Sequence, residues 1–211
     1  YFQTTNVTDS TVTMRLNAAN GGHLDFIYKL LPNSYVVDFT VQASGLQNFF
    51  SPSVKTMSVD WKQRARQMEK GYTFEQRYTS LTYKPVDDSF DYLSETKDEK
   101  ETIPESLDWV AFKNQYFSCV FMAAKALEKA GKSLGYDVKM EQQGSGYMKN
   151  YAADMKTAFD PTGAKASHMQ FYFGPNHFKT LLASNDLSFK DKDQELEDLV
   201  YLGWPIIRLI N

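Results

Sequence analysis

The sequence has few cysteines and histidines, on which many catalytic and metal sites depend. Its 211 residues include one cysteine, so an internal disulfide is impossible, and only three histidines. The histidines, His23, His168 and His177, do not follow the His-Glu-x-x-His spacing or a comparable metal-ligand spacing. The sequence has no Gly-x-Ser-x-Gly nucleophile motif and no glycine-rich phosphate loop. We therefore predict no catalytic activity, no cofactor and no metal.

The sequence also lacks a charge excess and a long apolar run. The formal net charge is -3, charged residues make up 23%, and the mean hydropathy is -0.48. These values are typical of a globular domain and exclude the basic field of a nucleic-acid-binding protein. No internal apolar run approaches the roughly 20 residues that a membrane-spanning helix needs. The N-terminus has no signal-peptide pattern, so we expect any targeting element outside this sequence.

The first third of the sequence alternates between apolar and polar residues with the period of β-strands. Strand-forming runs occupy Thr11–Asn17, His23–Leu30 and Tyr35–Gln42. Turn residues separate them, at positions 20–22 and 31–34. We predict three consecutive antiparallel strands with one buried face and one solvent-exposed face.

The middle of the sequence predicts further strands and two less regular segments. Residues 87–105 are acidic and poor in apolar residues, which favours a solvent-exposed loop. Residues 122–132 have a helix-forming composition, which favours a helix or a surface loop. The other segments are strand Thr56–Trp61, a strand or strand pair in Tyr72–Tyr83, the apolar core segment Leu107–Phe121, and strands Tyr136–Gln142, Gly146–Phe159 and His168–Phe173. We therefore expect an antiparallel β-sandwich of about ten strands.

The C-terminal fifth of the sequence changes character after the last predicted strand. A Gly-Pro turn is followed by a short predicted helix at Asn176–Ala183 and by a charged segment at Lys190–Asp198. No linker rich in proline, glycine or serine precedes this region. We divide the chain into a β-sandwich domain at residues 1–175 and a C-terminal helical segment at residues 176–211.

The last residues form a nearly uncharged run, Leu199–Ile210, that is about half as long as a membrane span. One interpretation is a helix that docks its apolar face on its own domain. The other is the start of a membrane helix, because Tyr201 and Trp204 are favoured at the headgroup level and Arg208 is able to extend toward it.

Three blocks of the sequence resemble one known family in their order and spacing. The blocks are residues 106–117, with Trp109, Tyr116 and Phe117, residues 171–181, with Gly174 and Pro175, and residues 202–204. They look like the periplasmic domain of the bacterial membrane protein insertase YidC, of the YidC/Oxa/Alb family, in its Bacteroidetes-type branch. One departure is Pro205, where the family usually has an apolar residue. Proline suits the first turn of a helix, so Pro205 would mark where the membrane helix begins.

The resemblance implies a fold and a location. The family's domain is an antiparallel β-supersandwich similar to galactose mutarotase, with C-terminal helices that lead toward a transmembrane helix. Trp109 and Phe117 are then expected to be buried core residues. The protein would belong to the cell inner membrane with this domain in the periplasm, and the chain would lack the family's N-terminal transmembrane helix and part of the early sandwich. A fold shared with sugar enzymes does not transfer their activity, so we expect no enzyme.

The resemblance also implies partners. In the family, a membrane core outside this sequence inserts and folds membrane proteins, alone or with the Sec translocon, and the periplasmic domain is an accessory that contacts SecDF subunits. We expect contacts with these subunits, with nascent membrane proteins through the membrane core, and with the lipid bilayer surface, but not with nucleic acid. The expected membrane-proximal coupling residues are Leu199, Tyr201, Gly203, Trp204 and Arg208.

Two other functions are open from the residues alone. Aromatic residues make up 15% of the sequence, enough to line the cleft of a carbohydrate-binding or mutarotase-like protein, although they also fill the cores of β-sandwiches. Saturable sugar binding would identify this function. The other alternative is an envelope adhesion or lipoprotein-type β-sandwich, which an upstream lipobox would identify.

Overall fold

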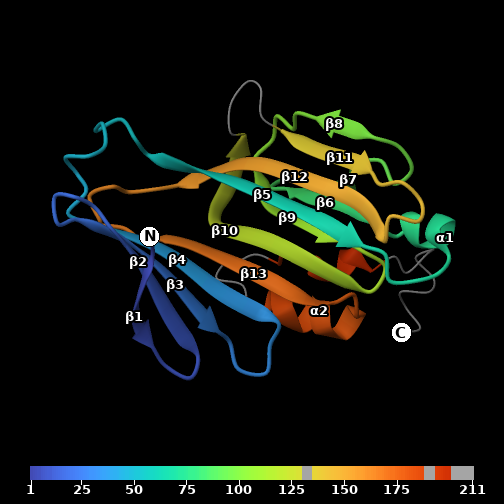
Figure 1. The fold of residues 1–211 in the computed structure, drawn as a ribbon, viewed down its shortest axis with the longest axis horizontal. Coiled ribbons are helices and arrows are strands. Elements are labelled where there is room, and N and C mark those ends of the chain that lie inside the picture. The colour runs from blue at the N-terminus through green and yellow to red at the C-terminus, as the bar shows by residue number, and fades with distance from the viewer. Residues whose placement is uncertain (130–134, 188–192, 201–211) are drawn as a thin grey trace.

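A computed structural model describes residues 1–129, 135–187 and 193–200 of the chain. Within these residues the protein is built mainly from antiparallel strands, which form two facing sheets (Figure 1). The predicted mainly β, antiparallel sandwich is therefore confirmed. The described residues contain thirteen strands, more than the sequence pattern predicted, because short edge strands and a long alanine-rich strand were not recognised.

The larger sheet, called sheet A, places the N-terminal strands beside strands from the middle and the end of the chain. In spatial order its strands are β1 (Gln3–Val7), β2 (Thr11–Asn17), β3 (His23–Leu30), β4 (Val36–Ser44), β13 (Ser167–Pro175), β10 (Phe117–Lys129), β9 (Leu107–Lys113), β6 (Ser80–Pro85) and β7 (Asp91–Tyr92). All neighbouring pairs in this sheet are antiparallel.

The smaller sheet, called sheet B, covers only part of sheet A (Figure 1). In spatial order its strands are β5 (Thr56–Arg66), β12 (Tyr147–Ala158), β11 (Tyr136–Met140) and β8 (Glu99–Glu101). The long strand β10 joins the two sheets: it pairs with β9 and β13 near its start and with β12 at Glu128 and Lys129. The sandwich is therefore continuous at one end.

The predicted N-terminal meander is confirmed, since β2, β3 and β4 are consecutive antiparallel neighbours. Successive side chains along these strands point alternately to the inner and the outer face of sheet A. Phe26 is aligned with Met14 and Val41 on the inner face, whereas Arg15 donates a hydrogen bond to Asp25 over 2.7 Å on the outer face. This pattern matches the expected pairing of one apolar face with one polar face.

The prediction of strand throughout residues 72–83 is wrong in its first half. Residues Tyr72–Gln76 form a short helix, α1, and only the following β6 is a strand. The fully buried carboxylate of Glu75 accepts hydrogen bonds from the backbone N–H groups of Met68 and Glu69, over 2.8 and 2.9 Å. This tertiary contact fixes a helical turn that the local β-propensity does not reveal.

The prediction of a helix or surface loop at residues 122–132 is also wrong for its described part. These residues continue β10 as far as Lys129, and Met122 and Ala123 are almost completely buried. Pairing with β13 places this alanine-rich segment in the middle of sheet A. Burial and the hydrogen bonds between strands outweigh a helix propensity of roughly a few tenths of a kcal/mol per residue.

The acidic segment at residues 87–105 is more ordered than the predicted solvent-exposed loop. It contains β7 and β8, and its side chains Leu93 and Ile103 are 0% and 3% exposed. These two residues belong to the inner core between the sheets. The segment therefore covers one end of the sandwich while its charged side chains face solvent.

The inner core lies between sheet A and sheet B and is rich in aromatic rings. The indole of Trp61, on β5, stacks on Phe112 of β9 with ring centroids 4.0 Å apart. Phe112 also stacks on Tyr151 of β12, at 5.0 Å. Because these contacts join the two sheets, burial of large apolar side chains holds the sandwich together.

Two helical elements follow β13 and lie on the outer face of sheet A (Figure 1). They are α2 (Phe178–Asn185) and the 3-10 helix η1 (Leu196–Leu199). The predicted helix is confirmed with a shift of two residues. Among the described residues, no helix combines the length and the apolar composition that crossing a bilayer demands. Residues 201–211 lie outside the described part, so a lead into a transmembrane helix stays a prediction.

Candidate functional site

The C-terminal segment, residues 178–187 and 193–200, packs on outward-facing side chains of β4, β9, β10 and β13. These side chains and the segment form a second apolar cluster, on the opposite face of sheet A from the inner core. This outer cluster comprises Val36, Trp109, Ala111, Val120, Met122, Tyr172, Leu181, Leu196 and Leu199. None of them is more than 1% exposed, so hydrophobic burial fixes the segment on the sheet.

Trp109 is the centre of this contact. It is 0% exposed and lies on β9, aligned with Met122 of β10 and Lys84 of β6. Its indole N–H donates a hydrogen bond to the backbone carbonyl of Gln194, with 2.8 Å between the heavy atoms. The predicted burial of Trp109 is confirmed, but the residue is buried under the C-terminal segment and not between the sheets.

Polar contacts also hold the C-terminal segment in place. The ammonium group of Lys84 lies 3.1 Å from the carboxylate of Glu195. The Asn185 side chain accepts a hydrogen bond from the Leu196 backbone N–H over 3.2 Å and donates one to Glu197 over 2.8 Å. Asn185 therefore ties the end of α2 to the start of η1.

The motif residues near Gly174 lie at the end of sheet A, where Asn176 bridges two chain segments. The Asn176 backbone N–H donates to the Tyr116 carbonyl over 2.7 Å, and its side-chain amide donates to the Asn114 carbonyl over 2.7 Å. The hydroxyl of Ser118 donates to the Asn176 side-chain oxygen over 2.6 Å. These bonds join the turn between β9 and β10 to the start of the C-terminal segment.

Gly174 is required at this corner because a side chain would collide with its neighbours. A Cβ atom there would lie 2.6 Å from the end of the Tyr172 ring and 2.8 Å from Cβ of Tyr35. The Tyr172 ring is itself fixed, since it is fully buried and its hydroxyl donates to the Pro175 carbonyl over 2.7 Å. The Gly-Pro pair therefore has a packing role.

The prediction that Phe117 is a buried core residue is wrong. Phe117 is 49% exposed and the neighbouring Tyr116 is 42% exposed. Phe117 is the first residue of β10 and pairs with Pro175 at the end of the sheet. Its position lies beyond the region that sheet B covers, so sequence hydrophobicity overestimates its burial.

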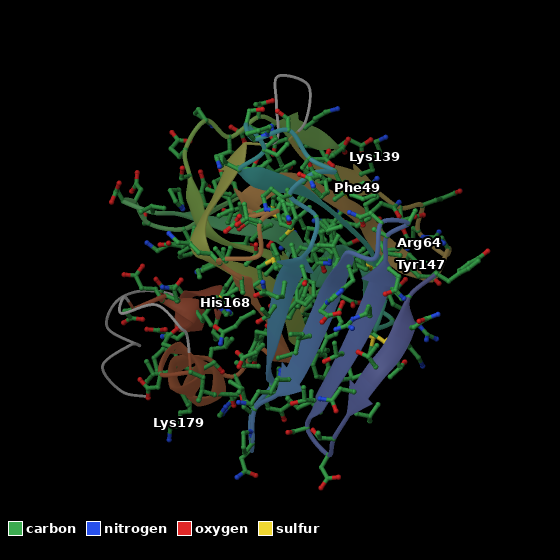
Figure 2. All side chains as sticks on the ribbon, turned by 90° about the vertical axis from the view of Figure 1, so that its left-hand side faces the viewer. Phe49, Arg64, Lys139, Tyr147, His168 and Lys179 are labelled. Carbon is green, nitrogen blue, oxygen red and sulfur yellow. The ribbon has the colours of Figure 1, made fainter. Side chains whose placement is uncertain are left out.

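Phe117 lies at the rim of an apolar face that the sequence did not predict. The inner face of β2, β3, β4 and β13 extends beyond sheet B, and Figure 2 shows its strands side by side. Phe39 contacts Phe26, Tyr28 and Phe171, with ring centroids 5.5, 4.7 and 5.9 Å apart. Phe173 stacks on Phe171 at 5.3 Å and is 48% exposed. We call this surface the open aromatic face.

The histidines and the cysteine make ordinary structural contacts. A His168 ring nitrogen lies 3.2 Å from the Thr40 hydroxyl, and one of His177 lies 2.9 Å from the Thr180 hydroxyl. Burial raises the pKa of the Cys119 thiol, which makes it less reactive. In the ranges that the structure describes, no group of three or more His, Cys, Asp or Glu side chains is placed to hold a metal ion.

The structure describes one of the five predicted coupling residues. Leu199 is 1% exposed and belongs to the outer cluster. The others, Tyr201, Gly203, Trp204 and Arg208, lie outside the described residues. Sequence reasoning did not foresee that Trp109 contacts the segment that precedes this run, because the two positions are 85 residues apart.

Comparison with known proteins gives the family. The family model described as the YidC periplasmic domain matches residues 1–210. The chain is 64% identical over 211 residues to a protein of Phocaeicola vulgatus named membrane protein insertase YidC, and 50% identical to the protein of that name from Bacteroides fragilis. Both matches cover 100% of this chain and 33% of the relative. The chain thus spans about a third of the length of these curated relatives.

A solved structure also resembles the chain. A galactose mutarotase related enzyme from Lactobacillus acidophilus superposes with a TM-score of 0.41 and 10% identity, over 82% of this chain and 70% of the other. The family match and the identities above, which extend over the whole chain, decide the assignment. The chain belongs to the family of YidC periplasmic domains.

Proposed function

We propose that this chain is the periplasmic accessory domain of a membrane protein insertase in the inner membrane, and that its C-terminal segment couples the sandwich to the membrane core. The hydrogen bond from Trp109 to Gln194 carries this proposal. It ties sheet A to the segment that immediately precedes the apolar run at residues 199–210. The domain itself would perform no catalysis.

The outer cluster supports a stiff connection. Leu196 and Leu199 are buried against sheet A, so the apolar run starts from a fixed point on the sandwich and not from a free linker. Tyr201 and Trp204 would then lie at the headgroup level, with Arg208 extended toward it. In this arrangement the orientation of the sandwich over the bilayer is set by the contact with Trp109.

The names of the relatives, membrane protein insertase, support nascent membrane proteins as the substrates of the whole protein. Nascent membrane proteins would be inserted by the membrane core, alone or with the Sec translocon, and SecDF subunits would contact the periplasmic domain. These partners act through a protein about three times as long as this chain. The chain contributes the accessory domain and its attachment.

A linker insertion tests the coupling. In a full-length insertase that carries this chain, six Gly-Ser residues are inserted after Val200, where the described segment ends. The sandwich keeps all its contacts but loses its stiff connection to the membrane, so insertion of a reporter membrane protein should fall several-fold. The Trp204→Ala substitution should weaken insertion in the same direction without unfolding the sandwich.

The matched control places the same six residues between Gly144 and Ser145, in the exposed turn that joins β11 and β12. This insertion should leave activity at the wild-type level. Protein amounts are compared by immunoblot. Wild-type insertion by the Val200 variant at normal protein level would contradict the coupling.

Carbohydrate binding is the second candidate, and the open aromatic face is the observation that favours it. Rings such as Tyr28 and Phe173 are partly exposed there. Sugar sites also need convergent polar groups beside the rings, whereas Leu24 and Val37 are the aliphatic neighbours on this face. Saturable binding of a sugar to the purified chain, abolished by Phe173→Ala, would support this candidate.

A further inference from the structure

A cavity of about 320 Å³ opens beside the end of the C-terminal segment, and the proposed coupling does not use it. Its walls come from four stretches of the chain, at residues 77–82, 90–95, 113 and 198–199. Arg77 lies after α1, Ser80 and Thr82 on β6, Lys113 at the end of β9, and Asp198 in η1. The C-terminal segment therefore supplies part of the cavity wall.

Two cationic side chains line this cavity and form no salt bridge with a described carboxylate. Among the described residues, neither Arg77 nor Lys113 has an acidic oxygen within 4.0 Å of its side-chain nitrogens. Lys113 is half-buried, and this burial lowers the pKa of its ammonium group. A partly desolvated cation without an ion pair is costly, and an anionic ligand would offset that cost.

The two hydroxyl groups in the wall add a hydrogen-bond donor. Ser80 and Thr82 are each 3% exposed, and their hydroxyl oxygens are 3.0 Å apart. One hydrogen bond between two hydroxyls uses one of their two protons. The second proton is left to bind an acceptor in the cavity.

Two carboxylates, those of Glu95 and Asp198, also line the cavity. Glu95 interacts electrostatically with Lys113 and with Lys149, a fully buried residue that does not line the cavity. The lining therefore holds two cationic and two acidic side chains, and no salt bridge joins these described residues.

We propose that this cavity binds a phosphate group, and that the phosphate belongs to the headgroup of a membrane phospholipid. A guanidinium, an ammonium and a hydroxyl are the usual donors to phosphate oxygens. Phe90 and Tyr92 at the rim provide apolar contact for the glycerol region. The assignment of the phosphate to a lipid rests on the proposed function, because the cavity adjoins Leu199, where the apolar run begins. The phosphate site itself does not depend on the proposed function.

Binding is measured on the purified 211-residue chain with two probes. Inorganic phosphate is titrated by calorimetry, and vesicles are tested by flotation. One vesicle type contains phosphatidylethanolamine and phosphatidylglycerol, and the other contains a phosphate-free galactolipid. The variants are Arg77→Gln and Lys113→Gln, which remove the positive charge and keep a polar side chain. The control is Lys139→Gln, on the outer face of sheet B, far from the C-terminal segment (Figure 2).

The expected result is saturable phosphate binding by the wild type and the control, weakened about 10-fold or more in both cavity variants. The variants should also float less with phospholipid vesicles. If the wild type showed no saturable phosphate binding, or if Lys113→Gln bound phosphate as tightly as the wild type, the site would be overturned. Cavity-dependent phosphate binding with equal flotation on both vesicle types would overturn the lipid assignment in favour of free phosphate. Insertion is not measured, so these outcomes are independent of the linker experiment.

Discussion

Replacing Trp109 should show how much of the stability of the C-terminal segment depends on one side chain. Trp109→Ala removes a fully buried ring and its hydrogen bond to Gln194. Truncation of a buried aromatic residue to alanine costs about 3–5 kcal/mol. Because each kcal/mol lowers the melting temperature of a chain of 211 residues by about 2–4 °C, we expect a decrease of about 6–20 °C.

Trp109→Phe isolates the hydrogen bond from the packing. The phenyl ring fills most of the site but has no N–H donor, so the expected cost is about 1–3 kcal/mol. The loss of stability should be confined to the C-terminal segment. The backbone N–H groups of Leu196, Asp198 and Val200, which donate within the C-terminal segment, should exchange with deuterium faster than in the wild type, while exchange in β12 should not change.

Phe117→Ala is the matched control, since it truncates a second aromatic residue of the same motif block. Its side chain is 49% exposed, so the free energy of unfolding should change by less than about 1 kcal/mol. Unfolding is followed by circular dichroism, and exchange by mass spectrometry. Equal destabilisation by Trp109→Ala and Phe117→Ala, or unchanged exchange at residues 196–200 in Trp109→Phe, would refute the assignment of Trp109 as the anchor.

Two further predictions concern the packing corner and a buried charge. Gly174→Ala should destabilise the fold by about 1–3 kcal/mol in urea unfolding. The control Gly71→Ala, whose added Cβ meets Phe74 at an ordinary 3.8 Å, should be nearly neutral. Similar urea midpoints for the two variants would contradict the steric collision at Gly174. Burial lowers the pKa of Lys149 from 10.5 to about 8, so the unfolded chain binds more protons between these values and stability should rise with pH across that window. The Lys149→Met variant should lack this rise. If the stability of the wild type and of the variant changed equally with pH between pH 7.5 and 9.5, the lowered pKa of Lys149 would be excluded.

Local sequence patterns were enough to predict the strands whose two faces differ in polarity. In Thr11–Asn17 and His23–Leu30, alternation of apolar and polar residues marks the strands and their two faces, because successive side chains of a strand point to opposite sides. The motif blocks around Trp109 and Gly174 were also recognisable in the sequence, and they indicated the family that the comparisons confirm.

Tertiary structure decided the features that depend on distant partners. Residues 122–129 have helical propensity, yet pairing with β13 and β12 makes them a strand. Trp109 and Phe117 are similar in hydrophobicity, but only Trp109 is covered. The C-terminal segment packs over Trp109 on the outer face of sheet A, whereas sheet B does not reach the start of β10 on the inner face. The cavity that joins Arg77, Lys113 and Asp198 likewise has no local signal, because its walls meet only after the chain has folded.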